Sequence, residues 1–201
     1  MKTVFFDIDT QVDFLYPAGA LYVPGAERLV PAIERLNRHA VEHGIPLVSS
    51  IDAHSENDPE FKQWPPHCIA GTAGQLKPAV TMAGKTAVIP NRPVEIALDG
   101  AQQILLEKQQ FDLFTNPNIH QLLDRLAADH YVIYGVVTEF CVKCAAMGLL
   151  ETGKKVTLLS DAIQTLDPAA SEAMLAEFTR RGGALRTVQS YCQSDGFPAV
   201  E

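Results

Sequence analysis

Short apolar runs alternate along this chain with longer amphipathic stretches. Runs rich in β-branched and aromatic residues predict seven strand-like segments, at residues 3–8, 45–51, 86–90, 101–108, 130–137, 154–160 and 184–188. Apolar positions at helical spacing predict helices at residues 26–43, 118–129, 138–151 and 168–181. Residues 52–84 are polar and contain many prolines and glycines, which predicts a long loop. Loops of that length inside compact domains are usually functional.

Strands separated by helices predict right-handed crossovers and a mainly parallel sheet covered on both faces. The run at 130–137 is the most strongly apolar, so we expect it to be a central strand. Ligands in such folds bind beyond the carboxyl ends of the strands. Four residues that carry chemistry lie at or just past predicted strand ends: Asp9, Asp52, Lys108 and Cys141. The pattern therefore predicts that these side chains meet at one site.

Composition narrows the class of protein. At 201 residues with 47% hydrophobic and 20% charged residues, the chain fits a single globular domain spanning residues 1–201. A formal net charge of -8 argues against nucleic acid or an anionic membrane as a partner. Asp7 and Asp9 interrupt the first apolar run, so we expect no signal peptide, and no run approaches the ~18 apolar residues of a membrane span. We therefore expect a cytoplasmic protein, in which four cysteines indicate catalysis or metal binding rather than disulfides.

Cys141 follows the most apolar strand and falls in the predicted first turn of a helix, with Thr138 as N-cap. The positive end of the helix dipole is expected to lower the pKa of a thiol there, which favours a nucleophile. A cysteine that merely packs is the ordinary alternative. Cys141 and Cys144 also form a C-x-x-C pair, which a thiol-redox protein would place at such a turn.

The segment FFDIDTQVDF places Asp7, Asp9 and Asp13 at the end of the first strand. A polar strand end that caps a loop is the ordinary interpretation. A phosphatase of the haloacid-dehalogenase type is a second one, since its first motif is an apolar strand followed by D-x-D-x-T or D-x-D-x-V. Gln11 occupies the last position of that motif, and Asp161 stands alone where a later aspartate pair is needed. Both departures count against the phosphatase.

The predicted loop begins with a set of residues suited to metal binding: Asp52, His54, Glu60 and His67. Asp52 and His54, two residues apart on an extended segment, can point the same way. Imidazoles and carboxylates together suit Zn, Fe or Mn. An aspartate and a histidine at this spacing are also common at solvated strand ends, so spacing alone leaves the metal site open.

With these motifs together, the chain resembles the isochorismatase-like cysteine hydrolases, and within them most resembles nicotinamidases. DTQVDF is similar to the motif D-x-Q-x-D-F, whose first aspartate is here Asp9. Lys108, with Phe114 six residues later, is similar to the lysine that opens K-x-x-x-S-x-F. GVVTEFCV is similar to G-x-x-T-D-x-C-V, which carries the nucleophile Cys141. The most specific block, WPPHC-x-x-GT at residues 64–72, is similar to the nicotinamidase metal loop.

The resemblance implies a three-layer α/β/α fold with a mainly parallel six-stranded sheet, and a homo-oligomer, either dimer or tetramer. It implies hydrolysis of nicotinamide to nicotinate and ammonia through a thioester, as in NAD salvage. Asp9, Lys108 and Cys141 would be catalytic, and a cis peptide before Val137 would direct its N–H, with that of Cys141, at the oxyanion. A divalent metal, by expectation zinc, would hold the pyridine nitrogen, and the ring would pack against two aromatic residues, Phe14 and Trp64.

Some positions depart from the pattern. A third histidine of the metal set is missing, and Glu60 resembles a glutamate that some members use instead, with Glu56 and Asp58 as alternatives. Asp112 replaces the usual serine of the lysine motif, and Glu139 replaces the commoner aspartate before the nucleophile. Another amide or ureide hydrolase of the same superfamily, acting on carbamoylated amines or acylureas, therefore stays open. So does a non-catalytic protein that keeps the fold.

Overall fold

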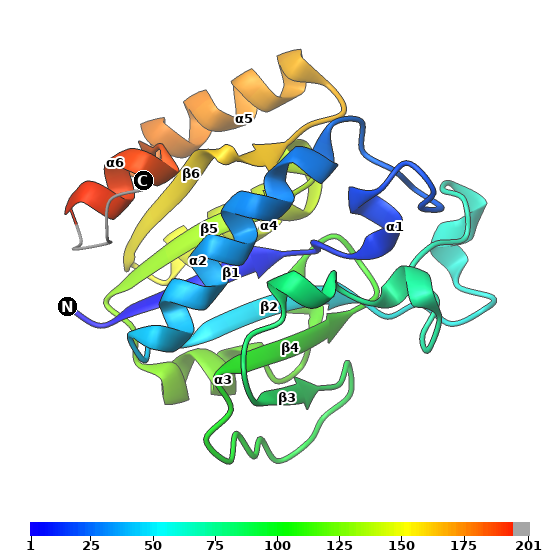
Figure 1. Ribbon diagram of the computed structural model, residues 1–201, viewed down its shortest axis with the longest axis horizontal. Coiled ribbons are helices and arrows are strands. Elements are labelled where there is room, and N and C mark those ends of the chain that lie inside the picture. Colours follow the sequence, from blue (N-terminus) through cyan, green and yellow to red (C-terminus); the bar gives the residue numbers. More distant parts are fainter. Residues whose placement is uncertain (195–201) are drawn as a thin grey trace.

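The computed structural model describes residues 1–194, and its centre is one parallel sheet (Figure 1). The strands are β1 (Thr3–Ile8), β2 (Leu47–Asp52), β3 (Thr86–Ile89), β4 (Gln103–Lys108), β5 (His130–Val136), β6 (Lys155–Gln164) and β7 (Ala184–Arg186). They lie side by side in the order β3-β4-β2-β1-β5-β6-β7, and every neighbouring pair is parallel. The mainly parallel α/β class is confirmed, and the seven strands correspond to the seven predicted apolar segments rather than to the six-stranded sheet that the resemblance implied. The short strand β7 adds one edge beside β6.

Helices cover both faces of the sheet, as expected for crossover connections. One face packs against α1 (Val12–Leu15), α2 (Val30–Glu42) and α6 (Val188–Ser194), and the other against α3 (Ile119–Leu126), α4 (Lys143–Glu151) and α5 (Pro168–Arg180). Alternation along β1 divides its side chains between the two layers, because Phe5 packs on the first face and Phe6 on the second. The predicted central strand β5 is buried along its whole length.

Three predicted elements differ in detail. The helix expected at residues 138–151 is split into a π turn at Thr138–Val142 and the α-helix α4. The strand expected at 184–188 ends at Arg186, and the unpredicted helix α6 follows it. Val188 and Tyr191, three residues apart, pack that helix against the sheet. The predicted loop at 52–84 begins with the last residue of β2, and residues 53–84 hold short 3₁₀ turns and an isolated β-bridge between His54 and Ile69. Within residues 1–194, no helix is long and apolar enough to cross a membrane.

Candidate active site

Four adjacent strands carry the predicted catalytic residues to one edge of the sheet. Asp9 follows β1, Asp52 and Lys108 end β2 and β4 in register with each other, and Cys141 lies in the π turn after β5. All four side chains are buried. The expected convergence at the carboxyl ends of the strands is confirmed, and it follows from the parallel order β4-β2-β1-β5.

Lys108 lies at the centre of this group. Its Nζ is 2.8 Å from Asp9 Oδ2 and 3.6 Å from Cys141 Sγ, and it also contacts Asp52 Oδ1. A lysine ammonium has three N–H donors, and these three contacts match that number. The other carboxylate oxygen of Asp9, Oδ1, accepts a hydrogen bond from Ser50 Oγ at 2.7 Å. One cation thus bridges two carboxylates and a thiol.

Burial and charge together set the protonation of this group. Burial alone would lower the pKa of Lys108, but the carboxylates of Asp52 and Asp9 outweigh it and hold the pKa well above its usual value. Burial raises the pKa of Asp9, and Lys108 opposes that rise. For Asp52, burial acts to raise the pKa, but Lys108 and His54 more than compensate and lower it. The lysine therefore stays charged, and Asp9 is poised to hold a proton.

Cys141 differs from expectation in two respects. Burial raises the pKa of its thiol well above the usual value, which Lys108 opposes and Asp9 reinforces, so the predicted lowering by a helix dipole is wrong. The thiol lies in a π turn rather than in the first turn of an α-helix. Thr138 is not the N-cap, because Val137 holds that position and Thr138 Oγ1 donates to Gln164 O at 2.9 Å. A thiol with a raised pKa favours its protonated form and would need a base to act as a nucleophile.

The backbone beside Cys141 is tightly packed. The peptide bond between Val136 and Val137 is cis, as the resemblance implied. Gly135 has a φ of 125°, and a Cβ there would collide with the carbonyl of Ile8, so only glycine fits where β5 meets the end of β1. Asp9 has a φ of 51°, which turns the chain sharply just after that strand.

A small pocket opens above Cys141 and is lined mainly by aromatic and aliphatic side chains. Phe14 and Trp64, both expected to contact a ring, line it. Phe111 and Phe140 line it too, with ring centroids 5.3 Å apart, and Phe140 meets Trp64 edge-on at 5.7 Å. Sequence reasoning missed these two, although each lies within three residues of Lys108 or Cys141. Leu21, Val23 and Leu166 complete the apolar wall. The arrangement suits a small flat substrate.

Three of the predicted metal ligands meet beside this pocket. Ligand atoms of Asp52, His54 and His67 lie within 4.8 Å of one another. Nε2 of His54 and Nε2 of His67 are 3.8 and 3.9 Å from Asp52 Oδ2, which is too far for a hydrogen bond. His67 Nδ1 faces Pro65 O at 2.7 Å and so carries the proton, which leaves its Nε2 lone pair free.

The donor set fits a divalent cation. His54 is completely buried, and its Nε2 has no hydrogen-bond partner in the described part of the chain. An orphaned buried imidazole nitrogen is costly unless something binds it. Burial lowers the pKa of His67, which keeps that ring neutral as a ligand must be. Two imidazoles and a carboxylate around one point are the ligand types that zinc, iron or manganese takes.

The three acidic residues considered as a fourth metal ligand occupy different positions around the histidines. Glu60 lines the pocket, with Oε1 4.0 Å from His67 Nε2. Asp58 Oδ2 lies 3.1 Å from His54 Nδ1, on the other side of that ring, where it can orient the imidazole. Glu56 is exposed. Glu60 is therefore the best placed of the three.

The two positions that depart from the motifs are anchors for nearby loops. Glu139 accepts hydrogen bonds from Thr165 Oγ1 and from the backbone N–H groups of Leu166 and Asp167, at 2.7 to 2.9 Å. It thereby ties the pocket wall at Leu166 to the π turn that carries Cys141. Asp112 accepts a hydrogen bond from Phe114 N at 2.9 Å and caps a 3₁₀ turn.

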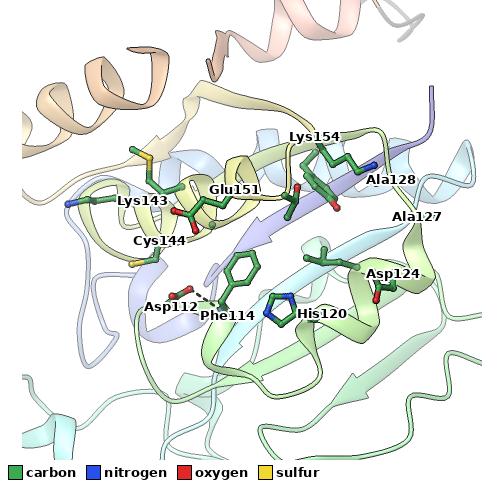
Figure 2. Close-up of a pocket in the computed structure, with 15 residues that line it drawn as sticks. Asp112, Phe114, His120, Asp124, Ala127, Ala128, Lys143, Cys144, Glu151 and Lys154 are labelled. Carbon is green, nitrogen blue, oxygen red and sulfur yellow. Dashed lines mark hydrogen bonds between the residues drawn. The ribbon is translucent and has the colours of Figure 1, made fainter. Parts of the chain in front are cut away.

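Cys144 does not share the pocket of Cys141. It lines a separate hollow of about 930 Å³ between α3 and α4, beside Asp112 and Phe114 (Figure 2). Burial raises the pKa of the Cys144 thiol. The two sulfurs of the C-x-x-C pair thus face different spaces, which does not favour thiol-redox chemistry. The larger hollow contains none of Asp9, Lys108 and Cys141.

Comparison with known proteins identifies the family of this chain. The Isochorismatase domain model matches residues 3–190. Nicotinamidase of Escherichia coli is 24% identical, over 94% of this chain and 96% of the relative. The Pyrococcus horikoshii pyrazinamidase in complex with zinc superposes with a TM-score of 0.79 and 26% identity, over 93% of this chain and 99% of that one. PnC1 of L. infantum in complex with nicotinate superposes with a TM-score of 0.75 and 27% sequence identity, over 94% of this chain and 93% of that one. The chain therefore belongs to the isochorismatase family and is a hydrolase similar to nicotinamidases.

Proposed function

We propose that this protein is a cysteine-dependent amidohydrolase that converts nicotinamide and water to nicotinate and ammonia. The observation that carries the proposal is the contact of one buried ammonium, Lys108, with Asp9 and Cys141, at the base of an aromatic pocket beside a metal-ligand set. The similarity to enzymes named nicotinamidase or pyrazinamidase supports the choice of substrate.

Asp9 is the base that makes the nucleophile. The buried thiol of Cys141 holds its proton, and Lys108 Nζ contacts both that thiol and Asp9 Oδ2, which places the carboxylate beside the thiol. Transfer of the proton to Asp9 gives a thiolate beside the Lys108 ammonium, which stabilises the new negative charge. Burial, which raises the pKa of Asp9, also suits the carboxyl to carry the proton until the next step.

The thiolate then attacks the amide carbonyl carbon, and the carbonyl oxygen gains negative charge. Val137 and Cys141 both line the pocket, and we assign their backbone N–H groups to this oxyanion. Collapse of the tetrahedral species breaks the C–N bond, with Asp9 giving its proton to the departing ammonia. A thioester on Cys141 remains. Asp9 then takes a proton from water, and the hydroxide attacks the thioester carbonyl. The C–S bond breaks, Asp9 returns its proton to the Cys141 sulfur, and the released acid gives its proton to ammonia and leaves as nicotinate.

The ring is held by two parts of the pocket. Phe14 and Trp64 supply the apolar walls, together with Phe111 and Phe140. Asp52, His54 and His67, with Glu60 as a fourth, would hold a divalent metal, and we propose zinc. When bound, such a metal would supply a Lewis-acid partner for the pyridine nitrogen. Asp52 serves both parts of the site, since Oδ1 contacts Lys108 and Oδ2 faces the two histidines.

Ammonia release from nicotinamide tests the proposal, measured beside a panel of simple amides, carbamoylated amines and acylureas, with and without chelator. We expect fast, chelator-sensitive release from nicotinamide and none from Cys141→Ala. Release from another amide alone, still dependent on Cys141, would keep the catalytic group and reject the substrate. Release that persists in Cys141→Ala would reject the mechanism.

A further inference from the structure

Gln11 is a buried glutamine whose side chain holds the backbone of one metal-ligand candidate. Its Nε2 donates to Asp52 O at 2.9 Å and to Gln75 O at 2.8 Å, and its Oε1 accepts from Asp52 N at 2.8 Å. The side chain has no exposed surface. Both backbone polar groups of Asp52 are thus bound by a single amide.

The reason lies in how β1 ends. Along a parallel ladder, Asp9 N donates to Ser50 O at 3.1 Å, and the next bond would join Asp9 O to Asp52 N. Asp9 instead adopts a left-handed conformation, and its carbonyl accepts from Gln11 N at 2.8 Å. The side-chain amide of Gln11 takes the place of the missing strand, offering an acceptor to Asp52 N and a donor to Asp52 O. The hydrogen-bonding pattern along β2 thereby extends to Asp52, although the β1 backbone has already turned away at Asp9.

We infer that Gln11 is a positioning residue for the metal site, acting through Asp52. This inference rests on the proposed metal site. Asp52 must direct Oδ1 at Lys108 and Oδ2 at the two histidines, so a small rotation of its backbone would spoil both contacts. Groups that orient a ligand in this way typically contribute 10- to 100-fold to metal affinity.

The same segment also holds the other side of the site. The carboxylate of Asp13 accepts from Cys68 N at 2.7 Å and from Ala20 N at 2.9 Å, and Cys68 directly follows His67. Gly74 packs so closely on this carboxylate that a Cβ there would collide with it. Gln11, directly before α1, and Asp13, within it, therefore fasten Asp52 and the residue after His67 to one short segment.

Gln103 offers a matched control. It is also completely buried, and its amide accepts from Ala83 N at 2.8 Å and donates to Ser49 Oγ and Thr81 O. It makes three bonds of the same kind as Gln11 but touches no metal-ligand candidate. Methionine at either position keeps the length of the side chain and removes all three bonds without adding charge.

The experiment measures the zinc affinity of purified full-length wild type, Gln11→Met and Gln103→Met by competition with a chromophoric chelator. Circular dichroism and thermal melts, with and without zinc, verify folding. We expect Gln11→Met to bind zinc about 10- to 100-fold more weakly, and Gln103→Met to stay within about threefold of wild type. Zinc should also raise the melting temperature of Gln11→Met less than that of Gln103→Met.

Equal zinc affinity in Gln11→Met and wild type would overturn the inference while leaving the metal site intact. A wild type that holds no zinc would remove the metal site and the inference together. If Gln11→Met does not fold, Asp13→Asn in the same assay takes its place, with an expected loss of about tenfold. Wild-type affinity in that variant would contradict the role of the α1 segment.

Discussion

Two buried lysine–aspartate pairs lie at the end of β1, and they differ in what else they touch. Asp7 accepts hydrogen bonds from four side chains, namely Thr10, Ser49, Asn37 and Lys77. Asp9 has Ser50 and Lys108 as neighbours and faces the pocket. Both lysines are almost fully buried. The two carboxylates stand two residues apart, Asp7 within β1 and Asp9 in the turn just after it.

The two carboxylates differ in how fully their hydrogen-bonding capacity is satisfied by neighbouring side chains. The partners of Asp7 are themselves held, because Asn37 binds Thr81 O and Tyr134 Oη as well. Such a network fixes the strand and loop to one another and leaves no room for a substrate. Around Asp9, one cation is shared among two carboxylates and a thiol, and a pocket lies above them. A buried ion pair thus indicates chemistry only when it opens onto a pocket.

The strongest test of the difference between the two ion pairs is to neutralise each aspartate in turn. We expect Asp9→Asn to lower kcat for nicotinamide by about 10³-fold, because the base is lost. Asp7→Asn should leave kcat within about threefold but lower the free energy of unfolding by about 3 kcal/mol, because Lys77 stays buried without a full charge partner. Steady-state kinetics and urea unfolding of both variants give the answer. Near-normal turnover in Asp9→Asn would show that the acid/base assignment is wrong.

Replacing each lysine by methionine tests whether its positive charge serves catalysis or only stability. Lys108→Met should reduce kcat by about 10²-fold, since the thiolate loses the charge that stabilises it. Lys77→Met should keep most activity. Each variant leaves a buried aspartate unpaired, so both should unfold more easily, by about 3 kcal/mol or more. If the two variants lost activity equally, the distinction between the networks would fail.

Metal removal separates binding from nucleophile activation. After dialysis against chelator, we expect KM for nicotinamide to rise about tenfold, equivalent to about 1.4 kcal/mol of lost binding. Restored zinc should reverse the change. The rate of Cys141 alkylation at neutral pH should stay within about twofold, because Lys108 contacts both the thiol and Asp9 without the metal. An alkylation rate that depends strongly on zinc would contradict this separation, because it would mean that the metal also activates the Cys141 thiol.

The smallest expected effect concerns the pocket wall. Glu139→Ala removes the hydrogen bonds that hold Leu166 and its neighbours, and KM should rise about threefold, in line with a net loss of about 0.7 kcal/mol. Glu151→Ala, which removes only a surface contact to Arg181, is the control and should change KM little. An unchanged KM in Glu139→Ala would mean that the wall does not depend on this anchor.

Much of the fold was predictable because strands and helices of this chain have clear periodicity. The meeting of Asp9, Asp52, Lys108 and Cys141 was predictable too, since parallel strands end at one edge. Gln11 was not recognised as an anchor because its partner Asp52 is 41 residues away, and no local spacing shows that a side chain completes a ladder.

The predicted direction of the pKa shift of Cys141 was wrong for a related reason. A position after a strand suggested a helix dipole, but burial and the neighbouring carboxylates, which come from other strands, decide the shift. The pairing of Lys77 with Asp7 likewise joins residues 70 apart. The helix α6 could have been found, because Val188, Tyr191 and Cys192 are apolar at helical spacing.

The central claim is that amide hydrolysis passes through a thioester on Cys141. Turnover of nicotinamide in the presence of hydroxylamine tests it directly, because an acyl-enzyme transfers its acyl group to that nucleophile in competition with water. We expect nicotinohydroxamate to replace nicotinate in proportion to the hydroxylamine added while ammonia release continues, and no product from Cys141→Ala. Continued ammonia release with nicotinate as the sole product, or hydroxamate formed equally by Cys141→Ala, would contradict the thioester.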